Sequence, residues 1–382
     1  MSALQIDGLG LVGGFGCGVS QLQAALERGQ VEPSAVEAEP VQASLGTARS
    51  ATFTGALPVY RADTSSLEHY LNKRVLRRID HFSRMALLGA FQALEDVQAR
   101  QQVTLDRSRL GVVLCSGFGA LNTTFKFLDS VIDDGDPFAS PTAFSNSVHN
   151  AAAAHISMQL GISGPGLTLS QFDHSFAAGL LQAQQWLEEN RVDAVLLGIV
   201  DEYSSVLGYC WERFLGTNAS TRMQPFATTS NTAVPGEGAA FFVLQPANGS
   251  ARSYAFLEYM QTGNVRADWP EPDSAVLVLG GEGYPPTGAM YRSHLPATAQ
   301  VACYTPLYGA SPVATGFDVA VAALSLERGY VYPQATSALE GDTPWRMINT
   351  ATAVKHLTCV DFSVGGEYSV ISLAASSRCQ GE

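Results

Sequence analysis

The sequence predicts an α/β protein made of two similar halves, and three observations lead to this prediction. Residues Leu110–Cys115 and Ala194–Val200 are continuous apolar runs, which are typical of strands buried on both faces. The stretch Gly164–Gly179 joins an alternating strand to an Ala-rich helix through a tight elbow, a geometry that presents one side chain at a helix N-terminus. The order strand, helix, strand, helix, strand, strand occurs twice, which predicts parallel-rich sheets with helices between and outside them.

The first half begins with a strand within residues 4–19, where a glycine cluster lacks the spacing of a dinucleotide-binding loop. Residues 31–66 are polar and irregular, and we expect them to form a surface excursion. Short apolar runs and apolar residues at helical spacing predict the other elements. They are helices at Gln21–Gln30, 80–99, Leu121–Ile132 and Ala151–Leu160, the elbow helix to about residue 190, and a strand at Ala240–Leu244.

The strand pattern starts again near residue 275, in a second half that is shorter than the first. A helix is expected at Phe317–Arg328, among short apolar runs that predict strands. These strands are expected at Ala275–Leu279, Val301–Thr305, Met347–Thr350, Cys359–Ser363 and Tyr368–Leu373. We therefore divide the chain into an N-terminal half, residues 1–245, and a shortened C-terminal half, residues 246–382.

The composition argues against several classes of function. The net charge of −13 disfavours nucleic acid or an anionic membrane surface as a general partner. The sequence has no run of about 18 apolar residues and no signal-peptide pattern, so we expect neither a membrane span nor export. The six cysteines are scattered without a CxxC pair, which predicts reduced thiols, no metal site and a cytoplasmic location. No cofactor is expected.

Four basic residues stand together in this acidic chain: Lys73, Arg74, Arg77 and Arg78. They could form a docking patch for an acidic partner. The alternative, which we favour, is a solvated helix face that balances local charge.

Several short motifs, in order along the chain, carry a resemblance to a known family. They are Asp80-His81-Phe82-Ser83, the run Ser140–Asn150 with Gly161–Pro165, Gly236-Glu237-Gly238-Ala239, and Phe362–Gly366. With them the chain resembles the β-ketoacyl synthases of the thiolase fold over nearly its whole length. It looks like the branch found in bacterial aryl polyene and related type II polyene clusters. The resemblance implies two βαβαβ halves that form an αβαβα layered core.

In that family the elbow carries a nucleophilic cysteine in a Gly-Pro…Thr-Ala-Cys context, assisted by two histidines and a lysine. Here the Gly-Pro is present, but the cysteine position falls on Asp173. The histidine positions fall on Ala310 and Val370, and the lysine position on Thr305. The resemblance therefore implies that no catalytic residue of thioester chemistry remains. We expect Asp173 to cap or stabilise the helix N-terminus and to stay ionised there.

The resemblance implies a chain length factor, the non-catalytic subunit of a ketosynthase heterodimer. Its partner would be an active ketosynthase, and acyl carrier protein would reach the complex through that partner. By the same resemblance, one face of the helix after Leu110–Cys115 would line the acyl tunnel, through Leu121, Thr124, Phe125 and Leu128. The dimer interface would include Thr142, Ala143, Phe144, His149 and Asn150.

Three alternatives stay open at this point. The chain could be an enzyme in its own right, a decarboxylase or hydrolase that uses Asp173 and His174, although adjacent side chains at a helix start diverge. It could be a plain scaffold that holds pathway enzymes together. The tunnel residues could also be ordinary core or interface residues.

Overall fold

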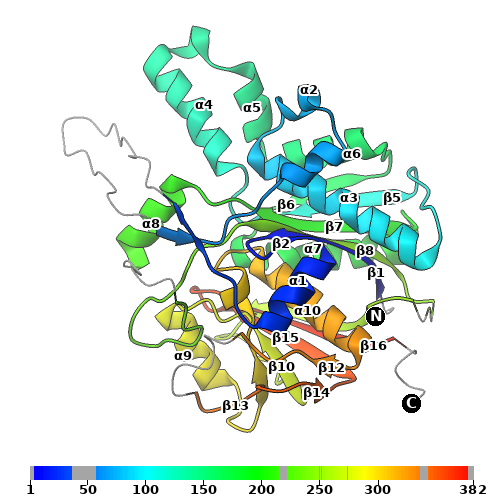
Figure 1. Cartoon of the computed structure of the whole chain (residues 1–382), viewed down its shortest axis with the longest axis vertical. Helices are drawn as coiled ribbons and strands as arrows, with labels where there is room; N and C mark the ends of the chain where they lie inside the picture. The colour runs from blue at the N-terminus through cyan, green and yellow to red at the C-terminus, as the bar shows by residue number, and fades with distance from the viewer. Residues whose placement is uncertain are drawn as a thin grey trace.

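The computed structural model describes residues 4–36, 57–215, 222–248, 250, 252–272, 274–335 and 343–376. Most of the surface excursion predicted at 31–66 lies outside these ranges. The described strands and helices form a layered α/β body from which one helical hairpin projects (Figure 1). Within the described ranges, no helix combines the length and the apolar composition that a membrane crossing requires.

A single twisted sheet runs through the body, in the order β13-β11-β10-β15-β16-β9-β1-β8-β7-β5-β6, with β2 beside β1. Its first-half strands are β1 (Leu4–Gly13), β2 (Gly16–Cys17), β5 (Leu110–Cys115), β6 (Gly166–Leu169), β7 (Ala194–Asp201) and β8 (Gly238–Pro246). The others are β9 (Ala255–Asn264), β10 (Val276–Leu279), β11 (Gln300–Ala302), β13 (Arg346–Met347), β15 (His356–Phe362) and β16 (Glu367–Ala375). Two small pairs lie apart: β3 (Ser34–Val36) with β4 (Leu57–Val59), and β12 (Tyr330–Val331) with β14 (Thr352–Ala353).

The strand order repeats about the centre of the sheet. From β1 outward the order is β1-β8-β7-β5-β6, and from β9 outward it is β9-β16-β15-β10-β11. In both groups the first two pairings are antiparallel and the next two are parallel. The antiparallel pair of β1 and β9 joins the groups. The repeated strand order that the sequence predicted is therefore present in the sheet.

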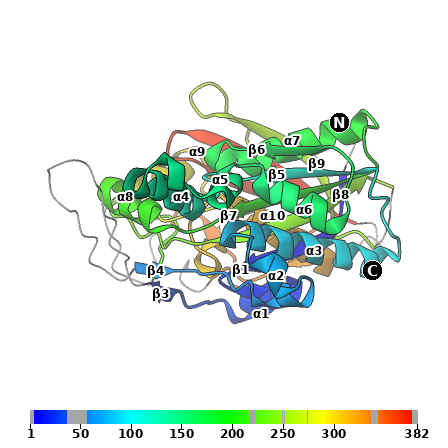
Figure 2. The same ribbon diagram turned by 90° about the horizontal axis from the view of Figure 1, so that it is seen from above.

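Helices cover both faces of these strands. They are α1 (Val19–Arg28), α2 (Lys73–Leu76), α3 (His81–Gln101), α4 (Leu121–Asp134), α5 (Pro141–Ser147), α6 (Ala151–Leu160), α7 (Ser175–Glu188), α8 (Ser205–Leu215), α9 (Pro285–His294) and α10 (Ala314–Arg328). Single turns of 3₁₀ helix are η1 (Ser65–His69), η2 (Asp136–Phe138), η3 (Phe172–His174) and η4 (Thr305–Leu307). Seen from above, α3 and α6 lie on one side of the sheet (Figure 2).

The helices α7 and α10 form the middle layer. Both contact strands of the two groups: α7 packs on β5, β7 and β9, and α10 packs on β8, β15 and β16. Their side chains join the inner faces of both groups in one apolar core, while α3 and α6 close a second core on the outer face of the first group. The result is the αβαβα layering expected from the thiolase-like fold.

The second group of strands lacks the outer helix that covers the first. The long helix α3 packs on β1, β8 and β7, whereas the described residues of the β9–β10 connection form no helix. The outer face of the second group is covered only in part, by α9 and the aromatic side chains around Tyr291 and Phe362. The second group of strands therefore has fewer helices around it than the first.

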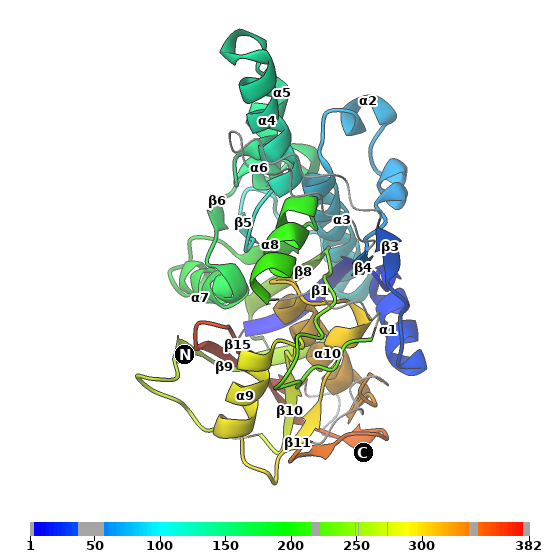
Figure 3. The ribbon, with the colours of Figure 1, turned by 90° about the vertical axis from the view of Figure 1, so that its left-hand side faces the viewer.

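The hairpin of α4 and α5 projects beyond the rest of the molecule (Figures 1 and 3). None of the side chains of α4 is fully buried. The two helices hold each other through the Phe127 and Phe144 rings, whose centroids are 5.3 Å apart. An apolar helix surface that nothing in this chain covers is suited to packing against another protein.

Candidate functional site at the elbow

The elbow forms where β6 ends and α7 begins. Ser175 Oγ accepts a hydrogen bond from Gln171 N (2.8 Å) and lies 2.7 Å from Phe172 O and 3.0 Å from Ser116 O. Ser170 Oγ donates to Gly117 O at 3.2 Å. These short polar side chains replace the backbone pairing that is lost at the turn, because an unpaired buried backbone group is costly. The elbow is thereby tied to the end of β5.

A buried carboxyl holds the loop that follows β5. Asp201, at the end of β7, accepts hydrogen bonds from Ser116 Oγ (2.9 Å) and from the backbone N–H groups of Gly117 (3.0 Å) and Phe118 (3.0 Å). Burial raises the pKa of Asp201 to about 7 despite these donors. A Cβ at Gly117 would overlap Pro312, so this glycine allows the turn of residues 309–316 to pack against the elbow.

Carboxyl groups gather at the position where the family places its nucleophile. Partial burial, together with the charge of Glu367, raises the pKa of Asp173 to about 6. Burial raises the pKa of Glu282 well above its ordinary value, and the negative charges of Asp173, Asp361 and Asp318 add to that effect. These groups come from the elbow, the loop after β10, β15 and α10. We call Asp173, Glu282, Asp318 and Asp361 the carboxyl cluster.

Asp173 does not have the capping role that was expected of it. The N-cap of α7 is His174 rather than Asp173, and no side chain caps this helix. Asp173 was also expected to stay ionised, and a pKa of about 6 keeps it mostly ionised at pH 7, although burial and a neighbouring charge raise its pKa rather than lower it.

Asp173 and His174 do not form a nucleophile–base pair. Both ring nitrogens of His174 are buried without a hydrogen-bond partner in the described part of the chain. Burial lowers the pKa of His174, so the ring is neutral at pH 7. This geometry gives no support to an enzyme that uses these two side chains as a dyad.

The resemblance assigns the lysine and the two histidines to Thr305, Ala310 and Val370, and these three residues have different surroundings. Ala310 is buried and its backbone forms an isolated bridge with the segment just before β8, through Ala310 N to Val234 O (2.8 Å) and Gly236 N to Ala310 O (3.1 Å). Thr305 is buried in η4. Ser311, next to Ala310, donates its N–H to Glu282, so this turn reaches the carboxyl cluster. Val370 is not part of that group, because it packs in the outer-face core of the second strand group.

Neither Cys115 nor Cys303 offers a reactive thiol to the elbow. Cys115 lies under α7 against Gly179, but it is fully buried, and burial raises the pKa of its thiol far above the ordinary value. Burial also raises the pKa of the Cys303 thiol to about 12. A thiol that stays protonated at neutral pH is a poor nucleophile.

Two of the short sequence motifs, Asp80–Ser83 and Gly236–Ala239, contact each other in one polar network. His81 Nε2 lies 2.9 Å from Glu237 Oε1, and Arg61 contacts the same fully buried carboxylate at 3.3 Å. Glu237 also accepts from the backbone N–H groups of Ala62 (3.0 Å) and Tyr203 (3.1 Å). Burial acts to raise the pKa of Glu237 and to lower the pKa of His81. The contact between the two side chains outweighs burial, so the pKa of Glu237 is lowered and the pKa of His81 is raised. A buried charge of this kind is tolerated only when it is paired.

The same region fixes the base of the α4–α5 hairpin. Glu202 accepts from Asn122 N (2.8 Å), and Asn122 Nδ2 donates to Tyr203 O (2.9 Å). Thr123 Oγ1 donates to Asp80, whose carboxylate caps α3. The hairpin is therefore anchored through side chains of α4 to the ends of β7 and α3.

The predicted tunnel residues all lie on α4 and are half-buried or exposed. Leu121, Thr124 and Phe125 are half-buried, and Leu128 is 42% exposed. Thr124 Oγ1 donates to Ala120 O at 2.9 Å and lies 3.4 Å from Ser147 O, so it faces α5. These residues are therefore not part of a packed core within this chain.

The predicted interface residues lie on α5 and at the start of α6. Phe144 is 55% exposed, and Thr142, His149 and Asn150 are also exposed, with Ala143 half-buried. The His149 ring packs at Gly119, just before α4, and Asn150 precedes α6 without a side-chain cap. Asn146, on the same helix α5, donates a hydrogen bond to Arg78 O at 2.9 Å.

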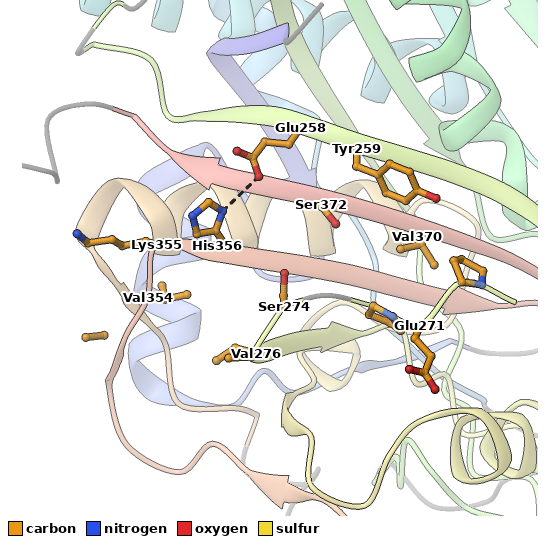
Figure 4. Close-up of a pocket in the computed structure, with 14 residues that line it drawn as sticks. Glu258, Tyr259, Glu271, Ser274, Val276, Val354, Lys355, His356, Val370 and Ser372 are labelled. Atoms are coloured by element: carbon orange, nitrogen blue, oxygen red, sulfur yellow. Dashed lines mark hydrogen bonds and ion pairs between the residues drawn. The ribbon is translucent and has the colours of Figure 1, made fainter. Parts of the chain in front are cut away.

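A separate cavity of about 770 Å³ lies on the uncovered outer face of β9, β15 and β16. Its floor holds a chain of hydroxyls, Ser274 to Thr358 (2.6 Å) and Thr358 to Ser372 (2.9 Å). Glu258 and His356 form an ion pair of 3.2 Å at its edge (Figure 4). Neither this cavity nor the rest of the described residues brings together three or more side chains that could hold a metal ion.

Known proteins resemble this chain in sequence and in fold. The family described as beta-ketoacyl synthase, N-terminal domain, matches residues 3–249, more than half of the chain. A 3-oxoacyl-[acyl-carrier-protein] synthase 2 of Staphylococcus aureus is 26% identical over 186 residues, covering 47% of this chain and 46% of that protein. The chain thus spans about half the length of the curated relatives it matches.

Solved structures match over almost the whole chain. The ishigamide ketosynthase/chain length factor has a TM-score of 0.77 at 16% identity, covering 98% of this chain and 99% of that one. A type II PKS acyl-carrier protein in complex with its ketosynthase has a TM-score of 0.74 at 15% identity, covering 98% and 99%. At these identities the likeness concerns the fold, whereas the sequence family is shown by the match to residues 3–249. The chain belongs to the beta-ketoacyl synthase family.

Proposed function

We propose that this chain is the non-catalytic chain length factor of a ketosynthase heterodimer. The observation that carries the proposal is the elbow itself, where Asp173 stands in the carboxyl cluster and both ring nitrogens of the adjacent His174 lack a hydrogen-bond partner among the described residues. A carboxylate is a poor acceptor for an acyl group from a thioester, and a neutral His174 without a partner activates nothing. Thr305, Ala310 and Val370 supply no other catalytic group.

The surface around the elbow supports a partner of the same fold. The strand β6 is at one end of the described sheet, so one of its edges lacks a neighbour, and an open edge is a template for pairing with another chain. Figure 3 shows β6 and α7 at one margin of the molecule, with α4 and α5 projecting above them. Large apolar side chains are exposed on α5, α6 and α7 and in the segments beside them: Phe144, Val148, Met158, Phe172 and Leu181.

In this proposal the partner is an active ketosynthase that carries the thiol and both imidazoles. The chain completes the interface through α5 and walls the tunnel for the growing acyl chain through α4. The half-buried Leu121, Thr124 and Phe125 and the exposed Leu128 become enclosed when the partner covers the hairpin. Acyl carrier protein reaches the complex through the partner. The product class, a conjugated polyene with or without an aryl head in a type II polyketide or fatty-acid-like pathway, rests on the resemblance of the Ser140–Asn150 run.

The experiment is reconstitution with an active ketosynthase from the same organism, followed by acyl loading and product analysis. We expect the two chains to co-purify and the acyl group to reside on the partner alone by mass spectrometry. Asp173→Ala should leave turnover of the complex within a few-fold. A loss of about a thousandfold, the scale of a catalytic group, or acylation of this chain would refute the proposal.

A further inference from the structure

Phe172, the residue before Asp173, has an unusual backbone conformation. Its φ is 49°, in the left-handed region that a bulky side chain adopts only at a cost in free energy. In the described residues Gln102 (φ 57°) and Asn190 (φ 54°) are the other non-glycine residues with positive φ, and each follows the end of a helix. Left-handed residues are common at helix ends. Phe172 lies at a helix start, where that explanation does not apply.

Hydrogen bonds from Ser175 to the Phe172 carbonyl hold this conformation, whereas the Phe172 ring gains little from the rest of this chain. Its side chain is 65% exposed, so burial of the ring does not stabilise the conformation. Its ring contact is with Phe118, in an edge-to-face pair with centroids 5.9 Å apart. The family context given above has the small residue alanine before the nucleophile, whereas this elbow carries a large aromatic ring. A large aromatic ring left exposed on a backbone of unusual conformation is a reason to look for a function.

The position of the ring connects the elbow with the tunnel helix. Phe118 stands in the loop that Asp201 holds after β5, and α4 begins three residues later with Leu121. Phe172 follows the free edge strand β6. The aromatic pair therefore lies between the edge that would join the partner and the helix that would line the tunnel.

We propose that Phe172, supported by Phe118, is a specificity-determining wall of the acyl tunnel at the boundary between the two subunits. This inference rests on the proposed function. The ligand class is a flat, apolar, conjugated acyl chain, which an aromatic edge-and-face pair contacts without requiring hydrogen bonds. The backbone conformation aims the ring away from this chain's own core, so its contact surface is completed only in the heterodimer.

The test compares three complexes of this chain with its ketosynthase: the parent, Phe172→Gly and the matched control Gln102→Gly. Both substitutions relieve a positive φ at an exposed residue, so both variants should melt at or above the temperature of the parent. Only Phe172→Gly should change the products. We expect the ratio of long to short polyenes to shift about tenfold or more, the scale of an altered hydrophobic pocket.

The outcomes separate this inference from the proposed function. If the parent chain does not assemble with the ketosynthase, the proposed function fails. If all three complexes assemble and Phe172→Gly gives the parent's product distribution, the tunnel-wall assignment is overturned and the proposed function stands. If Phe172→Gly alone does not assemble, Phe172→Leu keeps an apolar contact, and unchanged products from that complex overturn the assignment.

Discussion

Replacing Asp318 by Asn should stabilise the protein at alkaline pH and have much less effect in acid. Asp318 is 2% exposed on α10, and Tyr308 Oη donates a short hydrogen bond to its carboxyl. Burial raises the pKa of this carboxyl to about 7, from about 3.8 in the unfolded chain. A carboxyl with a raised pKa favours the folded state most below pH 3.8, and this contribution is lost as the pH rises through about 7.

The size of the effect follows from that shift. Between pH 5 and pH 8 the unfolded carboxyl is ionised throughout, whereas the folded carboxyl must lose its proton near pH 7. The free energy of unfolding should therefore fall by on the order of 3 kcal/mol for this group over the interval, at about 1.4 kcal/mol for each pH unit below pH 7 and by little above it. An Asn has nearly the same shape, can accept the Tyr308 hydrogen bond and does not ionise. The stability difference between variant and parent should grow by that amount.

Urea unfolding of the assembled complex, followed by circular dichroism at one protein concentration and at pH 5, 6.5 and 8, measures this difference. The matched control is Asp106→Asn, at an exposed carboxylate whose pKa is lowered by hydrogen bonds from Ser108. This control variant should show no gain in the free energy of unfolding at pH 8. A difference between Asp318→Asn and the parent that stays constant from pH 5 to pH 8 would contradict the assignment of Asp318 as a carboxyl with a raised pKa.

Two further predictions concern the surface. The chain alone should aggregate or form ill-defined oligomers, because obligate interfaces in complexes bury about 2,000 Å² or more and the apolar residues around β6 are left uncovered. A monodisperse monomer with a cooperative melt, seen by light scattering and calorimetry, would argue against it. Reversing the charges of the exposed Lys73, Arg74, Arg77 and Arg78 should barely change turnover, because the negative chain repels an acidic carrier protein and docking occurs on the partner. A marked fall in turnover that added salt does not reproduce in the parent would instead place docking on this patch.

Apolar runs predicted the strands that have buried faces, and missed those that do not. The bounds of β5 and α6 agree with the expectation to the residue. The strand β9 was missed because its residues alternate irregularly between exposed and buried, so no run marks it. The helix α9 was missed because it opens with two prolines and buries only Thr287, Gly288 and Tyr291. Short elements stabilised by distant contacts leave a weak local pattern.

The carboxyl cluster shows the same limit at the candidate site. Spacing in the sequence located Asp173 at the elbow, because a strand-to-helix turn is a local feature. Glu282 was missed, although an acid three residues after a buried strand, comparable to Asp201 at the end of β7, could have indicated it. Asp318 and Asp361 come from α10 and β15, and only the pairing of distant strands brings them together. Their raised pKa values follow from that burial and from no property of the local sequence.

The assignment of α4 as the tunnel helix can be tested by filling the space beside Thr124. Within this chain Thr124 is half-buried and faces α5, and no side chain of α4 is fully buried. A Trp at this position therefore does not meet a packed core, where overpacking would cost roughly 1–3 kcal/mol of stability. We expect Thr124→Trp and Leu128→Trp to assemble normally and to yield shorter polyenes. Lys126→Trp, on an exposed part of the same helix, is the matched control and should leave the length unchanged. Gel filtration checks that the complexes assemble, and product analysis then measures polyene length. An unchanged length distribution from intact Thr124→Trp and Leu128→Trp complexes would show that α4 does not line the tunnel.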